Sequence, residues 1–295
     1  MSLKIDEIKA MGSEEEFEDY IKKNFKIKHT QEWIIGSGRG EKIFQLMDKF
    51  NSEFKKSLIL DLGCGYGGIS LFLAKKAESV IGVDINRESI NVAHLRTKIS
   101  RGASFSTILS SATNVPLKEA SVDFVLINGV LEWIPCSKPY QDPMSTQLEA
   151  LGEVKRVLKR RGRMLLAIEN RYYLRYWLGS KDTHSGLRFV PILPRKVADM
   201  VSIVIKGKRY LNRTYSYFEL KNILKKLGLT TVKVYMGIPD YVFPEEIVGI
   251  DDKEEMRKKI SSVRQRGSRR VVWGMLTKMG LMKLFGSNFI VLCQK

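Results

Sequence analysis

The sequence is poor in cysteine and has no long hydrophobic run. Its three cysteines, Cys64, Cys136 and Cys293, lie far apart among 295 residues and form no C-x-x-C pair. They predict neither a disulfide framework nor a metal site, and such usage suits a reducing cytosol. No run of about 18 uncharged apolar residues occurs, so we expect no membrane-spanning helix. The charged start of the chain is unlike a signal peptide, and we expect a cytoplasmic protein.

Acidic residues are scarce relative to basic ones. The chain has 32 Asp and Glu against 50 Lys and Arg, which gives a formal net charge of +18 at pH 7. Such a field attracts anions, for example nucleic acids, phosphorylated sugars or acidic lipid surfaces, but it can also serve solubility alone. The excess is concentrated in residues 253–283, where ten Lys or Arg accompany only two acids, Glu254 and Glu255.

Glycine is concentrated in one stretch that follows an apolar, β-prone run at residues 58–62. Gly63, Gly65, Gly67 and Gly68 give four glycines within six residues, and residues 69–74 can then be helical. The pattern predicts a strand, a tight turn and a helix. Glycine allows positive φ and a close approach of the backbone to a ligand. The helix start offers free N–H groups to the same ligand.

The spacing of this turn fits two kinds of cofactor. Gly63, Gly65 and Gly68 satisfy the dinucleotide pattern G-x-G-x-x-G, and Asp84 lies about 20 residues further on, where a ribose-binding carboxylate is expected. Asp61, two residues before the first glycine, would repel a pyrophosphate but favour the ammonium of a methionine-bearing cofactor. The full string D-L-G-C-G-Y-G resembles motif I of the class I S-adenosylmethionine-dependent methyltransferases.

This resemblance implies S-adenosyl-L-methionine as the cofactor and a set of residues that bind it. Many family members carry an aspartate after the third strand, to hold the adenine amino group. Ser111 stands there in this chain, and its hydroxyl can accept a hydrogen bond but carries no charge. The expected cofactor-binding residues are Asp61, Gly63, Cys64, Gly65, Gly67, Asp84, Ile85, Ser111, Ala112 and Asn128.

The order of elements predicts an α/β fold, a Rossmann-like doubly wound sheet of about seven strands with an antiparallel last strand. The expected strands are residues 58–62, 80–84, 105–110, 122–128, 163–169, 230–235 and 288–293, with helices at 87–99, 145–159 and 217–227. Ser13 with Glu16, and Ser216 with Glu219, each predict a capping box at a helix start.

Four segments are expected along the chain. Residues 1–52 form a helical N-terminal extension or lid, in which a loop at 29–39 joins two helices. Residues 53–170 form the cofactor-binding core. Residues 171–239 combine a substrate-side insertion after strand five with the end of the core. Residues 240–295 form a basic insertion after strand six and the last strand.

Ligands of open α/β sheets lie beyond the carboxyl ends of the strands, and polar side chains follow strands four and five here. Methyl transfer is an in-line displacement that depends on positioning, and an oxygen acceptor usually also needs a base. His184 is the best candidate because imidazole titrates near neutrality; Glu132 and Glu169 are the alternatives. The expected substrate-binding residues are Trp133, Asn170, Arg171, Tyr172, Arg188 and Tyr215.

The acceptor is open at this point. The strings I-E-N-R-Y-Y-L, D-T-H-S-G-L and R-T-Y-S-Y-F-E-L resemble methyltransferases encoded alongside cell-surface polysaccharide genes, which implies a polar small-molecule or glycan acceptor. An RNA methyltransferase is the alternative, motivated by the charge, although the chain lacks an RNP-type RNA-binding strand. A NAD-binding Rossmann protein is the second alternative.

The basic C-terminal segment adds one expectation about partners. Val272, Met275, Leu276 and Met279 share a helical face beside Trp273. A Trp- and Met-bearing apolar helix preceded by arginines suits an anionic membrane surface, which would give the protein a peripheral location. The same face could instead pack on the core, and the arginines could instead bind nucleic acid.

Overall fold

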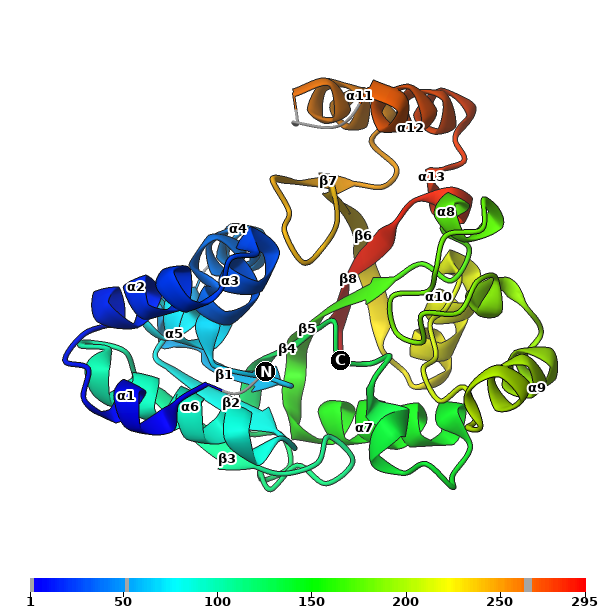
Figure 1. Cartoon of the computed structure of the whole chain (residues 1–295). Helices are drawn as coiled ribbons and strands as arrows, with labels where there is room; N and C mark the ends of the chain where they lie inside the picture. The colour runs from blue at the N-terminus through cyan, green and yellow to red at the C-terminus, as the bar shows by residue number, and fades with distance from the viewer. Residues whose placement is uncertain (1–2, 51–52, 263–266) are drawn as a thin grey trace. The chain divides into compact units, whose positions relative to one another are not determined.

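In the computed structural model, which describes residues 3–50, 53–262 and 267–295, the chain forms a mixed sheet flanked by helices (Figure 1). The sheet has eight strands in the order β3-β2-β1-β4-β5-β8-β6-β7. The α/β Rossmann-like expectation is therefore confirmed, with one strand more than expected. The strands are β1 Leu58–Leu62, β2 Ser79–Asp84, β3 Phe105–Leu109, β4 Val122–Asn128, β5 Leu158–Glu169, β6 Thr230–Ile238, β7 Glu246–Gly249 and β8 Asn288–Gln294.

The chain divides into two compact units. The first comprises residues 1–127, 153–165 and 295, and the second comprises residues 128–152 and 166–294. The N-terminal helices thus belong to the same unit as the glycine turn. The insertions after β5 and β6 belong to the second unit.

The first unit is built on parallel pairing around β1. Ile59 lies opposite Val80 of β2 and Phe124 of β4, and β2 pairs in parallel with β3. Strands buried on both faces read as continuous apolar runs, which is why β1 and β4 could be located in the sequence. Helices α5 Gly68–Ala74 and α6 Arg87–Ile99 follow β1 and β2.

The N-terminal extension is more helical than expected. It holds α1 Ile5–Lys9, α2 Glu14–Asn24, α3 Lys28–Ile35 and α4 Ser37–Asp48. The loop expected at 29–39 is wrong, because most of it forms α3 and the start of α4. Gly36 separates the two helices with a φ of +73°, a conformation that favours glycine.

The predicted capping box at Ser13 is only half present. The Ser13 hydroxyl accepts a hydrogen bond from the Glu16 N–H at 3.2 Å, but the Glu16 carboxylate accepts from the Gly12 N–H instead of reaching back to Ser13. The box at the start of α10 Tyr217–Lys226 is complete, because Ser216 and Glu219 each bond to the other's backbone N–H. That prediction is confirmed.

A buried arginine joins the N-terminal helices to the glycine turn. Arg96 of α6 is 2% exposed. Its guanidinium donates to the Glu14 carboxylate at 2.8 Å and to the carbonyl oxygens of Ile34 and Tyr66 at 2.9 Å each. Because a buried charge requires this degree of satisfaction, Arg96 links α2, α3 and the turn in a single network.

The second unit contains the antiparallel part of the sheet. Val234 of β6 lies opposite Val291 of β8, and Gly237 lies opposite Ile247 of β7. The antiparallel last strand is therefore confirmed. The missed strand, β7, lies inside the segment read from sequence as an insertion, and its four residues are too few for a clear alternating pattern.

Two further boundaries differ from expectation. Helix α7 Pro143–Val157 ends earlier than predicted, and β5 begins at Leu158. Arg160, Arg161 and Gly162, read as a helix end, therefore lie within β5, where Arg161 has a φ of +63°.

The remaining elements are helical, and all but the first of them lie in the second unit. They are η1 Phe54–Lys56, η2 Ile134–Ser137, α8 Leu174–Trp177, η3 Val190–Ile192, α9 Arg195–Lys206, α11 Lys253–Ser262, α12 Gly267–Met279 and α13 Met282–Phe285, with η1 alone in the first unit. None of the helices in the described part of the chain has the length and apolarity needed to cross a membrane.

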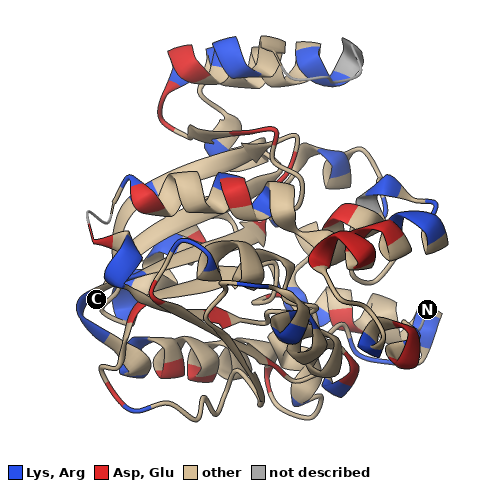
Figure 2. Cartoon of the chain, turned by 90° about the vertical axis from the view of Figure 1, so that its left-hand side faces the viewer, with Lys and Arg blue, Asp and Glu red and all other residues tan. Residues whose placement is uncertain are grey.

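The basic C-terminal segment exposes only part of the face that its sequence predicted. In α12, Trp273 and Leu276 are buried, whereas Met275 and Met279 are 60% and 68% exposed. Binding of this face to a membrane stays a prediction. Lys and Arg residues are spread over several helices and loops in the view of Figure 2.

Candidate active site

Three glycines of the turn after β1, Gly65, Gly67 and Gly68, differ in the space around them. Gly63, Gly65 and Gly67 have φ of +80°, +53° and +79°. A Cβ on Gly67 would lie 2.9 Å from a Phe105 ring atom, and one on Gly68 would lie 2.4 Å from the Ile35 carbonyl oxygen. A Cβ on Gly65 would meet no protein atom within 4 Å. Gly67 and Gly68 are thus required by packing, whereas Gly65 borders open space in which a ligand can approach the backbone.

Asp84, at the end of β2, is hydrogen-bonded to this turn. One carboxylate oxygen accepts from the Gly65 N–H at 2.9 Å and the other accepts from the Asn86 N–H at 2.8 Å. Each oxygen retains a lone pair for a further donor. The adjacent Ile85 is 59% exposed, so a carboxylate and an apolar side chain stand together beside the turn.

Asp61, the acid of the motif, is buried beneath the turn. It is 2% exposed and accepts a hydrogen bond from the Ser70 hydroxyl at 2.6 Å. Burial raises the pKa of Asp61 to about 6, although the Ser70 bond and the charge of Arg39 act in the opposite direction. Arg39, from α4, was not among the predicted site residues; its position in the lid segment was the only signal.

The other predicted cofactor residues differ in how they are engaged. The Ser111 hydroxyl bonds with Thr113 Oγ1 at 3.0 Å and accepts from its N–H at 3.2 Å, which shapes the turn that contains Ala112. Cys64 is buried, and burial raises the pKa of its thiol well above the usual value. Asn128 lies at the end of β4, and its amide nitrogen has no hydrogen-bond partner among the described residues.

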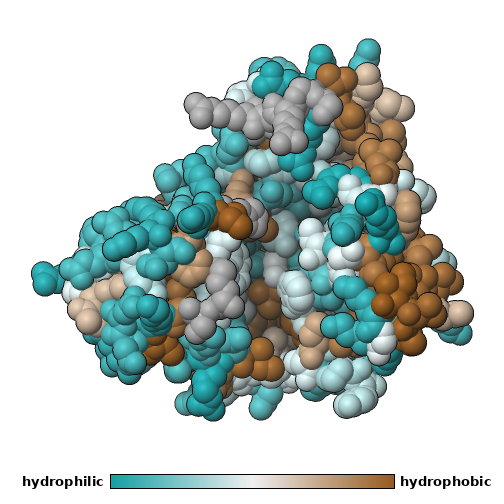
Figure 3. Space-filling view, in the orientation of Figure 1, coloured by the Kyte–Doolittle hydropathy of each residue, from teal (hydrophilic) through white to brown (hydrophobic). Residues whose placement is uncertain are grey.

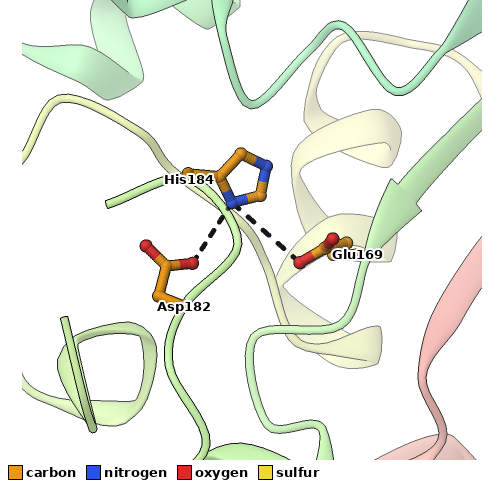
Figure 4. Close-up of side chains that lie close together, drawn as sticks. All are labelled: Glu169, Asp182 and His184. Atoms are coloured by element: carbon orange, nitrogen blue, oxygen red, sulfur yellow. Dashed lines mark hydrogen bonds and ion pairs between the residues drawn. The ribbon is translucent and has the colours of Figure 1, made fainter. Parts of the chain in front are cut away.

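The second unit brings His184 together with three acids, two of which, Glu169 and Asp182, are drawn in Figure 4. His184 Nδ1 lies 3.2 Å from Asp182 Oδ1 and 3.9 Å from Glu169 Oε2, and Nε2 lies 3.9 Å from Glu132 Oε1. The histidine side chain is only 3% exposed. The structure therefore unites the predicted catalytic residues, which come from three separate segments of the chain.

The acids are themselves held in place. Glu169 accepts from the Tyr176 hydroxyl at 2.6 Å and from the Thr183 hydroxyl at 2.9 Å. Glu132 is fully buried and accepts from the Tyr241 hydroxyl at 2.9 Å, while its Oε2 has no hydrogen-bond partner within the described ranges.

The electrostatics of this cluster increase the basicity of the histidine. Burial alone would lower the pKa of His184, but the bond to Asp182 and the charges of Glu169 and Glu132 outweigh it and raise the pKa above its ordinary value. Burial raises the pKa of Glu132 to about 7 despite the opposing charge of His184. Burial also acts to raise the pKa of Asp182, yet the hydrogen bonds from His184 and Ser185 hold it below its usual value.

These donors also satisfy one test for a metal site. Ligand atoms of Glu169, Asp182 and His184 lie within 4.8 Å of one another. These groups already have hydrogen-bond partners: His184 is bonded to Asp182, and Glu169 accepts from Thr183 and Tyr176. We therefore interpret the cluster as a hydrogen-bonded acid–base network, in which Asp182 is the member that the sequence analysis missed. Its place two residues before His184 was the available signal.

Half of the predicted substrate residues are accessible. Trp133 is 47% exposed and its ring centroid lies 4.9 Å from that of His184. Tyr172 is half-buried against Trp177, with ring centroids 6.1 Å apart. Arg188 is exposed and donates to the Gly179 carbonyl oxygen.

The other three predicted substrate-binding residues form hydrogen bonds within the protein. Asn170 is fully buried and donates to the carbonyl oxygens of Leu284 and Gly286 at 2.8 Å each. Arg171 donates to Glu219 and to two carbonyl groups of the insertion. Tyr215 is 1% exposed and donates to Gln147. These contacts favour a scaffold role for all three, and their contact with substrate stays a prediction.

A small pocket with basic walls and a cavity volume of about 30 Å³ lies in the second unit. Arg195 and Arg213 line it with Tyr210, and each arginine has a buried Nε without a hydrogen-bond partner among the described residues. Burial and then the charge of Asp182 raise the pKa of Tyr210, which places this wall of the pocket next to the histidine cluster. Arg195 and Tyr210 were not predicted; the clustering of Arg and Tyr between 171 and 215 was the signal.

Comparison with known proteins identifies the domain. Residues 60–166 match the family model described as a methyltransferase domain. Over 157 residues the chain is 27% identical to the uncharacterized protein MJ0638 of Methanocaldococcus jannaschii, covering 53% of this chain and 57% of that protein. It is 34% identical over 102 residues to the 23S rRNA (uracil(747)-C(5))-methyltransferase RlmC of Vibrio vulnificus, covering 34% of this chain and 26% of that protein.

The fold agrees with a solved methyltransferase structure. The geranyl diphosphate C-methyltransferase of Streptomyces coelicolor A3(2), determined with S-adenosyl-L-homocysteine, matches with a TM-score of 0.51 and 15% identity over 88% of this chain and 79% of that one. The matched part of the chain spans 57% of the length of MJ0638 and 26% of that of RlmC. Residues 60–166 are therefore a methyltransferase domain, in agreement with motif I, and S-adenosylmethionine is the cofactor of this domain.

Proposed function

We propose that the protein methylates an oxygen atom of a polar small-molecule or glycan acceptor, with His184 as the general base. The observation that carries this proposal is the hydrogen bond of 3.2 Å between His184 Nδ1 and Asp182 Oδ1. The lowered pKa of Asp182 keeps it ionised, and an ionised carboxylate only accepts hydrogen bonds. The proton of a neutral His184 therefore resides on Nδ1, which leaves Nε2 free to take another.

The predicted cofactor-binding residues contact different parts of S-adenosylmethionine. S-adenosylmethionine, when bound, supplies a sulfonium methyl group whose carbon an acceptor oxygen can attack in line, while the C–S bond breaks and its electrons remain on sulfur. Asp84 binds the ribose hydroxyls, and Asp61 with Arg39 complements the ammonium and carboxylate of the methionine part. Ile85, Ser111, Ala112 and Asn128 contact the remaining surface of the cofactor.

His184 then completes the proton balance of the reaction. Its Nε2 takes the proton that the acceptor hydroxyl loses as the new O–C bond forms, so the products are the methyl ether, S-adenosylhomocysteine and a protonated histidine. Asp182 orients the imidazole and stabilises its charged form, as the carboxylate does in Ser-His-Asp triads. Glu132 and Glu169 add negative charge, which raises the basicity of His184.

The acceptor class is inferred from the pocket lined by Arg195, Tyr210 and Arg213. Arginine forks bind carboxylate and phosphate groups in a planar, bidentate way, and Tyr and Trp rings bind sugar-like surfaces through their apolar faces. The cavity of about 30 Å³ is too small for a sugar ring, so these arginines would receive only an anionic group of a sugar or glycan acceptor, with the ring outside the pocket. Methylation of RNA is the second candidate, supported by the similarity to RlmC and the net charge of +18. We do not retain the NAD-binding alternative, because the domain is a methyltransferase domain.

The test uses donor with a labelled methyl group and cell extract divided into RNA, glycolipid and small-molecule fractions. We expect label to enter a hydroxyl-bearing small-molecule or glycolipid fraction, and ribonuclease to leave it intact. His184→Gln should abolish transfer without changing affinity for S-adenosylhomocysteine. His94→Gln is the matched control, because His94 is an exposed histidine of α6. Labelling of RNA alone would support RNA methylation. Full activity of His184→Gln would exclude His184 as the general base.

A further inference from the structure

Helix α9 presents its apolar side to solvent. Val197, Met200, Ile203 and Val204, which we call the α9 face, are 43%, 65%, 49% and 84% exposed. Their spacing of three and four residues places them on one side of the helix. Figure 3 shows a brown patch over the position that α9 occupies in Figure 1.

The opposite side of α9 explains why this face is left outside. Ala198 and Ser202 are buried, and Ala198 packs with Val190 and Tyr210 in a small apolar cluster. Ser202 donates to the Lys208 carbonyl oxygen at 2.8 Å. The helix therefore binds its own unit through small and polar side chains, which is the reverse of a helix that covers a core.

More exposed apolar side chains belong to the same insertion. Trp177, Leu178 and Phe189 are 50%, 75% and 43% exposed. A Cβ on Gly179 would lie 3.2 Å from Phe189 Cζ, so Phe189 packs beside the end of α8. Both α8 and α9 contact η3. Exposed apolar residues gathered in this way mark an interaction surface.

The charge around this surface has one sign. Residues 174–209, all of which the structure describes, contain two acids, Asp182 and Asp199. Asp182 is buried and bonded to His184, and Asp199 is paired with Arg195 at 3.1 Å. The exposed basic residues of this range are Arg175, Lys181, Arg188, Lys196, Lys206, Lys208 and Arg209.

We propose that the α9 face is a docking surface for an anionic lipid membrane. Aliphatic side chains that enter the headgroup boundary, surrounded by Lys and Arg, are the features of an interfacial helix. A second copy of the chain fits less well, because a symmetric contact would bring the same cations together. Nucleic acid would use the cations but gains from aromatic stacking, which the aliphatic α9 face does not offer.

This assignment differs from the membrane surface that the sequence predicted in α12. Trp273, the expected membrane anchor, is buried. The residues that lead into and begin α11 include four exposed acids: Asp251, Asp252, Glu254 and Glu255. Helix α12 retains Val271, Met275 and Met279 as exposed apolar residues, at 56%, 60% and 68%. It therefore provides a matched control of similar size and exposure.

The test is flotation of the full chain with phosphatidylglycerol-containing vesicles and with phosphatidylcholine vesicles. The variant Val197→Gln/Met200→Gln/Val204→Gln removes most of the α9 face, and glutamine is a good helix former. The control is Val271→Gln/Met275→Gln/Met279→Gln in α12. A second variant, Lys196→Glu/Lys208→Glu, reverses charge beside the α9 face. Affinity for S-adenosylhomocysteine checks that each variant is folded, and this readout does not depend on the acceptor.

We expect the wild type to bind phosphatidylglycerol vesicles more tightly than phosphatidylcholine vesicles, with weaker binding at high salt. Both α9 variants should lose about tenfold or more in partitioning, whereas the α12 variant should bind like the wild type. Equal binding by wild-type protein and both α9 variants would overturn the proposal. So would absence of vesicle binding, loss in the α12 variant alone, or a wild-type dimer that the α9 triple variant converts to a monomer.

Discussion

Replacing Gly65 by alanine tests the cofactor site at the position where the turn is open. Gly65 has a φ of +53°, and a Cβ there would meet no protein atom within 4 Å. Gly102, in the turn after α6, has a φ of +73° and the same open surroundings. Both alanine variants should therefore incur the same backbone strain of about 1–2 kcal/mol, seen as a fall in Tm of about 2–4 °C.

The two variants should differ in their affinity for S-adenosylhomocysteine. The strain is present with and without ligand, so it does not change affinity by itself. At Gly65 the added methyl group would occupy the space through which the cofactor reaches the backbone, and overpacking of this kind costs about 1–3 kcal/mol. We expect Gly65→Ala to weaken S-adenosylhomocysteine binding about five- to 150-fold by calorimetric titration, and Gly102→Ala to bind like the wild type. Equal affinities of the two variants would refute the assignment of the turn as the cofactor site.

Three further substitutions test the ribose contact, the buried arginine and the proposed base. Asp84→Ala should weaken the binding of S-adenosylhomocysteine by about 1.5–3 kcal/mol in titrations, since a charged hydrogen-bond acceptor is lost. An unchanged Kd would show that Asp84 does not bind the ribose. Arg96→Met should lower the free energy of unfolding by about 3–5 kcal/mol, because it strands Glu14 in a partly buried position, and denaturant titration would disprove this if the midpoint were unmoved. The pKa of His184 is raised partly by Glu132, so a base at His184 gains activity as pH rises through this raised pKa. Glu132→Gln should move this rising limb of kcat/KM to lower pH by about one unit, and a shift to higher pH would contradict the role of the base.

The cofactor half of the protein was largely readable from the sequence. Motif I, from Asp61 to Gly67, depends on local properties: a β-prone run, glycines that permit positive φ, and an acid at the end of the next strand. The bounds of β1, β4 and α6 are as predicted, because buried parallel strands and amphipathic helices carry strong periodic patterns. The role of each residue at this site stays a prediction that the Gly65 and Asp84 variants test.

The acid–base cluster was only partly readable. His184, Glu132 and Glu169 were named from their chemistry and their places after strand ends, but nothing local indicated that they meet. Asp182 was missed, because its hydrogen bond to His184 exists only in the folded insertion. The same folding placed Asn170 in contact with backbone carbonyls more than 100 positions away.

The sequence by itself determined the glycine turn, its cofactor and the order of most elements, because these follow from interactions between residues close in the chain. Tertiary structure alone decided which polar side chains are used in contacts within the protein and which helix faces are exposed. Arg96 reaches Glu14 across 82 positions, and α9 turns its apolar side outward while α12 buries its Trp273. A helical pattern identifies two opposite faces, but which face is covered depends on the partners that distant segments supply.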